Sequence, residues 1–367
     1  MIPIFEPFLG SKERKNLERC IDSNWISSQG EFILEFEDLF AAYHGCKHAV
    51  ATANCTAALH IVLKALGIGP GDEVICPDLT FIAPANMIVL SGAKLVLVDI
   101  DPVTLAIDPN LLEEKITSQT KAVIVVHQFG HAAPMDEILE IANRHGLKII
   151  EDNAESIGGR FKGKLLGTLG DVACFSFFAN KIITTGEGGA ILTDDDHIAE
   201  RSRILRDHGM SRTKRYHHVE LGFNYRMTNM QAAVGLAQLE KLASILCRRG
   251  EQMEWYYHSL SNVRGVELRK FQNWCDPVHW LMTISLDRSF GRADCIAYMK
   301  ECGIECRQMV NPVHRAVHFS QACQDEAFPQ ALDVSTRSLH LPSSTQLTKE
   351  QVGYIADAVK AFVKKNP

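Results

Sequence analysis

The chain alternates between short apolar runs rich in β-branched residues and longer segments with apolar residues at helical spacing. The predicted strands are 48–52, 73–76, 94–98, 121–127, 147–151, 172–178 and 188–193. The predicted helices between them are 56–66, 81–90, 109–116 and 134–144. Because a strand–helix repeat with short polar connectors is typical of a mostly parallel sheet covered on both faces, the pattern predicts an α/β fold.

Different patterns flank this repeat. Before it, residues 12–20 and 33–43 have apolar residues at helical spacing, with a polar loop at 24–30. After it come predicted helices at 197–207 and 228–246. From about residue 245 we predict helices at 248–260, 294–302 and 349–363 and strands at 280–286 and 304–307. We therefore expect a large domain at 1–245 and a smaller α+β domain at 246–367, with the 228–246 helix joining them.

A lysine follows the apolar run 172–178, and a glycine cluster follows the lysine at 186–189. Desolvating Lys181 at the end of a core strand is costly unless the amine has a partner or a chemical role. One role is a Schiff base with an aldehyde cofactor, since a lysine among apolar residues has a lowered pKa. Alternatively, the amine simply reaches solvent beyond the strand. Taken alone, residues 175–189 favour the second interpretation. The other candidate residues along the chain favour the Schiff base instead.

Other polar groups follow predicted strands, and ligands bind beyond the carboxyl ends of the strands in open parallel sheets. Thr56 opens the helix after strand 48–52, where free amides and a hydroxyl can hold an anion, although a plain helix cap fits equally well. Asp152 and Glu155 follow strand 147–151. An acid there can pair with a protonated ring nitrogen or simply cap the next segment.

These groups gain meaning together. In chain order they are Thr56, Phe81, Asp152, Ser176 and Lys181. They offer an anion site, a face for ring stacking, a partner for a pyridinium nitrogen and an imine-forming amine. Pyridoxal 5'-phosphate (PLP) requires this combination, which is far more specific than any single member. PLP is therefore the predicted cofactor.

Composition narrows the range of partners. Of the 367 residues, 46% are hydrophobic and 22% charged, and the net charge of -6 argues against nucleic acid as a partner. No run approaches the roughly 18 apolar residues of a membrane span. The N-terminus lacks the basic and apolar regions of a signal peptide. The 11 cysteines include no CxxC pair, which is typical of reduced thiols. We expect a cytoplasmic protein without membrane association.

Longer motifs extend the hypothesis to a family. They occupy segments 54–59, 69–74, 78–83, 126–130, 150–155, 170–181, 184–189 and 222–227. On these segments the chain resembles the DegT/StrS family of PLP-dependent sugar aminotransferases, from about residue 3 to residue 344. The resemblance implies the type I PLP-transferase (aspartate aminotransferase-like) fold. Segments 177–189 and 206–211 are most similar to the branch that aminates C4 of GDP-4-keto-6-deoxymannose.

The resemblance also implies roles for individual residues. Lys181 forms the Schiff base, Asp152 binds the ring nitrogen and Glu155 lies near the phenolic oxygen. The remaining cofactor contacts are ring stacking by Phe81 and phosphate binding by Cys55, Thr56, Ser176 and, from a neighbouring subunit, Asn224. A homodimer with shared active sites follows. The candidate substrate-binding residues are His127, Asn180, Arg226 and His314.

Two positions qualify these roles. The family usually has glycine before the phosphate-binding threonine, and Cys55 stands there, where its Cβ can crowd the phosphate site. A branch of sugar 3-dehydratases has histidine in place of the lysine. Lys181 therefore favours transamination over dehydration.

The implied reaction moves an amino group from glutamate to the 4-keto carbon of a nucleotide-diphosphate 4-keto-6-deoxy sugar and releases 2-oxoglutarate. Such a product belongs to deoxyamino-sugar biosynthesis for O-antigen and lipopolysaccharide. Two half-reactions in one site predict ping-pong kinetics. One alternative is an aminotransferase acting on a UDP- or dTDP-keto sugar or a keto-cyclitol. Another is a silent PLP-binding regulator, against which the intact Lys181 and Asp152 argue.

Three histidine and basic clusters have competing interpretations. His127 and His131 have the spacing of metal ligands on a helix, but they lie at a strand end without a third acidic ligand, so no metal is expected. The basic run at 212–218 fits either a solvated face or a mobile loop that binds a diphosphate. His314 fits either the substrate entrance or a structural role.

Overall fold

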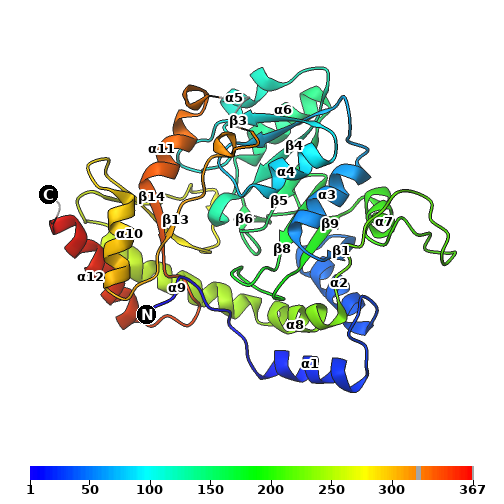
Figure 1. The fold of residues 1–367 in the computed structure, drawn as a ribbon, viewed down its shortest axis with the longest axis horizontal. Helices are drawn as coiled ribbons and strands as arrows, with labels where there is room; N and C mark the ends of the chain where they lie inside the picture. Colours follow the sequence, from blue (N-terminus) through cyan, green and yellow to red (C-terminus); the bar gives the residue numbers. More distant parts are fainter. Residues whose placement is uncertain (320–323, 366–367) are drawn as a thin grey trace.

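The computed structural model describes residues 1–319 and 324–365 (Figure 1). Its strands are β1 His48–Thr52, β2 Glu73–Pro77, β3 Lys94–Val98, β4 Thr120–Val126, β5 Lys148–Asp152, β6 Arg160–Phe161, β7 Lys164–Leu165, β8 Val172–Ser176, β9 Gly189–Thr193, β10 Val266–Leu268, β11 Cys275–Asp276, β12 Met282–Leu286, β13 Arg307–Gln308 and β14 Ser338–Leu341.

The α-helices are α1 Ser11–Asp22, α2 Glu31–His44, α3 Cys55–Ala65, α4 Ala83–Leu90, α5 Pro109–Leu112, α6 Met135–His145, α7 Asp196–Leu205, α8 Asn229–Glu240, α9 Leu242–Leu260, α10 Arg292–Glu301, α11 Pro329–Arg337 and α12 Lys349–Lys365. Short 3-10 turns lie at Glu113–Lys115, Gln128–Gly130, Val313–Arg315 and Asp325–Ala327. Among residues 1–319 and 324–365, no helix combines the length and apolar character needed to cross a bilayer.

The large sheet has seven strands in the order β1-β9-β8-β5-β4-β2-β3. Strands β8, β5, β4, β2 and β3 pair in parallel, and β9 is antiparallel to both of its neighbours, β1 and β8. Every strand of this sheet except β9 therefore runs the same way. The carboxyl ends of β1, β2, β4, β5 and β8 consequently meet at one edge, which confirms the predicted α/β class.

Successive residues of the central strands enter different cores, as the two-residue period of a strand requires. On β4, Ile124 belongs to the core that α3 and α4 cover. Its neighbours Val123 and Val125 belong to the core that α6 covers through Ile138 and Ile141. Both faces of the sheet are thus buried, which explains why its strands are continuous apolar runs.

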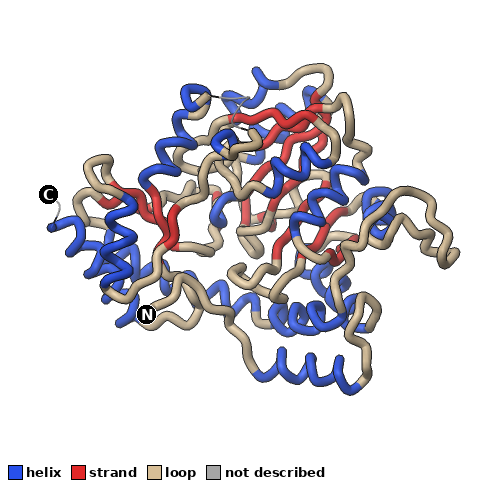
Figure 2. The backbone as a smooth tube through the Cα atoms, in the orientation of Figure 1, coloured by secondary structure: helices blue, strands red, loops and turns tan. Residues whose placement is uncertain are grey.

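A second group of strands, β10-β12-β14-β13, forms a smaller sheet (Figure 2). Its core is shared with α9, α10 and α12. Helix α9 joins the two cores: Leu242 and Ile245 pack in the core of the large sheet, and Tyr256 and Leu260 pack in the second. The predicted boundary between residues 245 and 246 falls within this continuous helix, and the division into domains stays a prediction.

Two expectations about single elements were wrong. Strand β8 ends at Ser176, and the chain then turns so that Lys181 lies in a loop. The amide of Phe177 donates to Gly188 O (2.8 Å) and the amide of Lys181 donates to Phe178 O (2.9 Å), which closes this turn. The helix expected at 228–246 is interrupted at Lys241, where α8 ends and α9 begins. Strands β6, β7, β10, β11 and β14 and helix α11 had no predicted counterpart.

Helix α2 shows how the sequence pattern fixes the packing. Its buried residues recur at three- and four-residue spacing, and Gly45 ends the helix with a left-handed φ of 71°. Phe40 lies edge-on to Phe175 and Phe177 of the β8 segment, with ring centroids 4.9 and 5.5 Å away. These aromatic contacts attach the helix to the strand that precedes Lys181.

We predict that Phe40→Ala lowers the free energy of unfolding by about 3–5 kcal/mol, because Phe40 is fully buried and its removal leaves a cavity. Denaturant titration measures the change. The exposed Glu35→Ala on the same helix is the control and should stay within about 0.5 kcal/mol of the wild type. Equal effects of the two substitutions would contradict this packing.

Candidate active site

A cavity of about 850 Å³ opens at the carboxyl ends of the parallel strands. Segments following β1, β2, β5 and β8 line it, as expected for an open parallel sheet. The predicted site residues among its lining are Cys55, Thr56, Phe81, Asp152, Glu155, Ser176, Asn180 and Lys181. Residues more than 100 positions apart in the chain thus share one cavity.

The Lys181 amine lies in this cavity beside an acid. Its Nζ is 3.6 Å from Glu155 Oε1, and the lysine side chain is only 13% exposed. The other carboxylate oxygen, Glu155 Oε2, accepts a hydrogen bond from the amide of Phe129 (2.8 Å). Burial raises the pKa of Glu155, and the lysine charge opposes that rise. The correction to β8 therefore leaves Lys181 inside the cavity rather than in solvent.

Asp152, the last residue of β5, is a buried acid at the cavity wall. Among the described residues, only the amide of Ala154 donates a hydrogen bond to its carboxylate (3.0 Å). Burial raises its pKa from 3.8 to about 6. A buried carboxylate with so little compensation favours a cationic partner, and the protonated ring nitrogen of PLP has the required charge.

The start of α3 offers an anion site. Asn54 caps the helix: its Oδ1 accepts from the amide of Ala57 (2.8 Å). The amides of Cys55 and Thr56 have no hydrogen-bond partner among the described residues, so they are free to bind a phosphate at the helix N-terminus. Gly189 of β9 packs against this backbone, because a Cβ there would lie 2.6 Å from the nitrogen of Cys55. The glycine is therefore required for β9 to support the helix start.

His127 does not reach the cavity, contrary to the expectation of a substrate contact. Its Nδ1 accepts from the amide of Ala133 (3.0 Å), so Nε2 carries the proton and donates to Glu151 Oε2 (2.9 Å). Glu151 precedes Asp152 on β5, and adjacent residues of a strand point to opposite faces. His127 therefore lies behind the sheet from the acid of the site.

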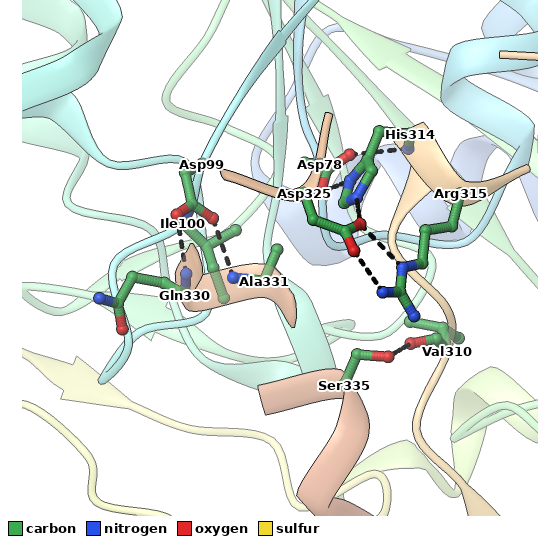
Figure 3. Close-up of polar contacts among 10 residues, drawn as sticks. All are labelled: Asp78, Asp99, Ile100, Val310, His314, Arg315, Asp325, Gln330, Ala331 and Ser335. Atoms are coloured by element: carbon green, nitrogen blue, oxygen red, sulfur yellow. Dashed lines mark hydrogen bonds and ion pairs between the residues drawn. The ribbon is translucent and has the colours of Figure 1, made fainter. Parts of the chain in front are cut away.

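His314 also lies outside the cavity lining, in a polar cluster with Asp78, Asp325 and Arg315 (Figure 3). Its Nδ1 lies 2.7 Å from Asp78 Oδ2 and its Nε2 lies 2.9 Å from Asp325 Oδ1. Arg315 pairs with the same Asp325, and this interaction lowers the pKa of Asp325. Asp78 follows β2, so the histidine links the segment before α11 to the large sheet. These contacts favour the structural alternative.

Asn224 and Arg226 do not line this chain's own cavity either, although Tyr225 between them does. Asn224 Oδ1 accepts from Arg226 Nη2 (3.0 Å), and Arg226 Nη1 lies 2.8 Å from Asp207 Oδ1. Asn224 is exposed. A contact between Asn224 and the phosphate of a neighbouring subunit stays a prediction.

Known proteins are similar to this chain in sequence and in fold. The sequence pattern of the DegT/DnrJ/EryC1/StrS aminotransferase family matches residues 7–360. This chain belongs to that family. The GDP-perosamine synthase of Caulobacter vibrioides is 44% identical over 363 residues, which cover 98% of this chain and 97% of the relative.

Solved structures extend the comparison for this aminotransferase. DesV of S. venezuelae, in complex with a ketimine intermediate, is 35% identical with a TM-score of 0.91, covering 96% of this chain and 94% of its own. The PLP form of the putative sugar aminotransferase Spr1654 of Streptococcus pneumoniae is 26% identical with a TM-score of 0.95, covering 100% and 99%. The type I aminotransferase fold predicted from the sequence is confirmed.

Several residues that line the cavity of this aminotransferase were missed by the sequence analysis: Phe129, Tyr225, Trp280, Arg307 and His340. Phe129 follows β4 and has a positive φ of 49°, which places it beside Glu155. The other four come from segments beyond residue 220, far from the strand–helix repeat. The weak signal available for Trp280 was an aromatic residue at the first position of a predicted strand.

The two histidines that share metal-ligand spacing have separate partners. His131 Nδ1 lies 2.6 Å from Ala132 O, and its Nε2 accepts from the amide of Gln272 (3.2 Å). His127 pairs with Glu151 instead. Within residues 1–319 and 324–365, no group of three or more histidine, cysteine, aspartate or glutamate side chains is arranged to hold a metal ion.

We predict that Asp152→Asn stabilises the cofactor-free protein at pH 7 by up to about 2–3 kcal/mol. The raised pKa of about 6 means that the folded state favours the neutral acid. The wild type therefore loses stability as pH rises from about 4 through about 6, and the variant does not. Denaturant titrations at several pH values measure this difference.

The exposed Asp38→Asn is the matched control and should leave the pH dependence unchanged. If Asp152→Asn had the same pH dependence as the wild type, the carboxyl of Asp152 could not be the uncompensated acid of the site.

Proposed function

We propose that this PLP-dependent aminotransferase transfers an amino group from glutamate to the 4-keto carbon of GDP-4-keto-6-deoxymannose or a close relative. The observation that carries the proposal is the joint placement of the Lys181 amine and the Asp152 carboxylate in one cavity with a free helix N-terminus. When bound, PLP supplies an electron-withdrawing ring that stabilises negative charge on the carbon beside the amino nitrogen.

Three groups of this chain would hold the cofactor. The amides of Cys55 and Thr56 and the hydroxyl of Ser176 would bind its phosphate. Asp152 would keep its ring nitrogen protonated, because the buried carboxylate gains a cationic partner. Phe81, 61% exposed in this chain, would offer its ring as a stacking face.

Lys181 Nζ would then carry the proton. As a base it would take the proton from the carbon that bears the donor amino group, and as an acid it would give a proton to the cofactor carbon on the other side of the same nitrogen. Glu155 Oε1 lies 3.6 Å from this amine and would help to keep it within the cavity. The second half-reaction uses the same groups in reverse, which predicts ping-pong kinetics.

The nucleotide and the sugar are proposed from the relative. The Caulobacter vibrioides protein that is 44% identical over nearly the full length of both chains is named GDP-perosamine synthase. At this level of identity the placement of the cavity residues supports the same class of GDP-linked keto sugar. Glutamate as the donor rests on the resemblance of the motifs alone.

A homodimer with shared active sites is part of the proposal. The loop that follows α7 extends away from the body of the molecule (Figure 1) and exposes Tyr216 (75%), Val219 (53%) and Leu221 (87%). Asn224 lies in the same loop, before α8 begins at Asn229. Exposed apolar residues favour burial against a partner, and a second copy would bring Asn224 to the neighbouring cavity.

We predict that the wild type, given glutamate and GDP-, UDP- or dTDP-linked 4-keto-6-deoxy sugars, aminates the GDP sugar most efficiently. Mass spectrometry of the products measures this.

Lys181→Ala should lower kcat by at least about a thousandfold, because the proton carrier is lost. The exposed Lys164→Ala is the control and should keep wild-type activity. A better UDP or dTDP substrate would overturn the nucleotide assignment, and an active Lys181→Ala would overturn the role of the lysine.

A further inference from the structure

We propose that Trp280 is a positioning residue for Lys181: its ring face supports the lysine amine while its indole N–H fixes the backbone beside that lysine. The inference rests on the proposed function, because it assigns the lysine amine as the group that moves the proton. Trp280 comes from the segment before β12, so this residue lies at the junction between the second sheet and the cavity.

Trp280 contacts two neighbouring residues, Asn180 and Lys181. Lys181 Nζ lies over the Trp280 ring, 3.7 Å from the ring centroid. The indole Nε1–H of Trp280 donates to Asn180 O (2.6 Å). One side chain thus contacts the tip of the lysine and the carbonyl immediately before it. A cation on the face of tryptophan is attracted by the ring, and more strongly where water is excluded.

Trp280 is itself held on two sides. Its ring lies nearly parallel to that of Phe129, with an interplanar angle of 13° and centroids 6.0 Å apart. Its carbonyl accepts from Nη1 of the buried Arg249 on α9 (2.9 Å). The residue is only 5% exposed. The indole is therefore fixed before any ligand binds, as positioning requires.

Glu155, Phe129 and Trp280 contact one another in sequence and surround the Lys181 amine. The amide of Phe129 donates to Glu155 Oε2 (2.8 Å), and Glu155 Oε1 lies 3.6 Å from Lys181 Nζ. The ring of Phe129 stacks on the ring of Trp280, and Lys181 Nζ lies over that same Trp280 ring. The amine thus has an acid on one side and an aromatic face on the other.

The acids and the aromatic ring beside the amine respond differently to a change in pH. The ionisable groups that face the amine are Glu155, Asp152 and Cys55, and Arg307 and His340 line the same cavity. Burial raises the pKa of both acids, which disfavours their negative charge. The Trp280 ring does not titrate. Its attraction for the amine therefore does not depend on the ionisation of either acid, and it holds the amine in place while the lysine is not bound to the cofactor.

The experiment compares Trp280→Leu, which loses both contacts, with Trp280→Phe, which keeps a ring face and loses the N–H. Trp274→Leu is the matched control, because Trp274 packs edge-on against Phe161 and has no contact with Lys181. The visible absorbance band of each PLP-loaded protein is titrated with pH. kcat and KM are measured with the sugar nucleotide that the wild type uses.

For Trp280→Leu we expect the midpoint of the absorbance titration and the alkaline limb of kcat to move down by about half to one pH unit. The visible band reports the protonation of the Lys181 nitrogen, and the protonated form loses the support of the aromatic ring. We expect kcat to fall at least about tenfold with KM for the sugar within about twofold. Trp280→Phe should lie between this variant and the wild type, and Trp274→Leu should match the wild type.

Trp280→Leu with wild-type midpoint and kcat would overturn the inference, and so would an equal shift in Trp274→Leu. If Trp280→Leu does not fold, Trp280→Phe decides: an unchanged kcat and titration overturn the inference. A wild type that forms no visible band with PLP refutes the proposed function itself. A wild-type band with an unaltered Trp280 variant refutes only the role of Trp280.

Discussion

A lysine amine 3.6 Å from a glutamate carboxylate, with a second acid at the same cavity wall, is the arrangement on which the rest of the molecule depends. Burial disfavours the charge on both Glu155 and Asp152. Three ionisable groups can share such a space only if the surrounding structure holds them there. Most of the features of the fold described above serve that placement.

The sheet provides the first level of support. Because every strand except β9 runs the same way, the segments after β1, β2, β5 and β8 meet at one edge. The two-residue period of β5 then separates its acids. Glu151 points behind the sheet, where His127 and the amides of Gly167, Leu169 and Gly170 satisfy it, and Asp152 points to the cavity. The Glu151 carboxylate is satisfied by hydrogen bonds within the structure, and the neighbouring Asp152 carboxylate is left for a ligand.

The second level of support comes from the other sheet. Trp280 lies between Phe129 and Lys181, and His314 links Asp78 to Asp325 beside the cavity. Residues that contact the lysine therefore belong to both parts of the chain. A change in how the two sheets pack would alter the position of the amine, which connects the energetics of packing with the chemistry of the site.

The sequence could predict the seven strands of the large sheet, most of the helices and those site residues that directly follow a strand. Thr56, Asp152 and Glu155 are of this kind, because the direction of a parallel sheet decides where strand ends lie. The surroundings of Lys181 could not be predicted, because the turn at 177–188 depends on hydrogen bonds between its own two ends, such as the one from the amide of Phe177 to Gly188 O. Trp280 is 100 positions from Asn180, and only tertiary packing pairs them. His127 was expected in the cavity because it ends a strand. A position at a strand end does not show on which face of the sheet its hydrogen-bond partner, Glu151, lies.

The covalent site of the cofactor tests the account most directly. The PLP-loaded wild type is reduced with borohydride, digested and mapped by mass spectrometry. The account predicts that the visible band disappears and that the pyridoxyl group is found on Lys181. A pyridoxyl group on another lysine, with Lys181 unmodified, would contradict it.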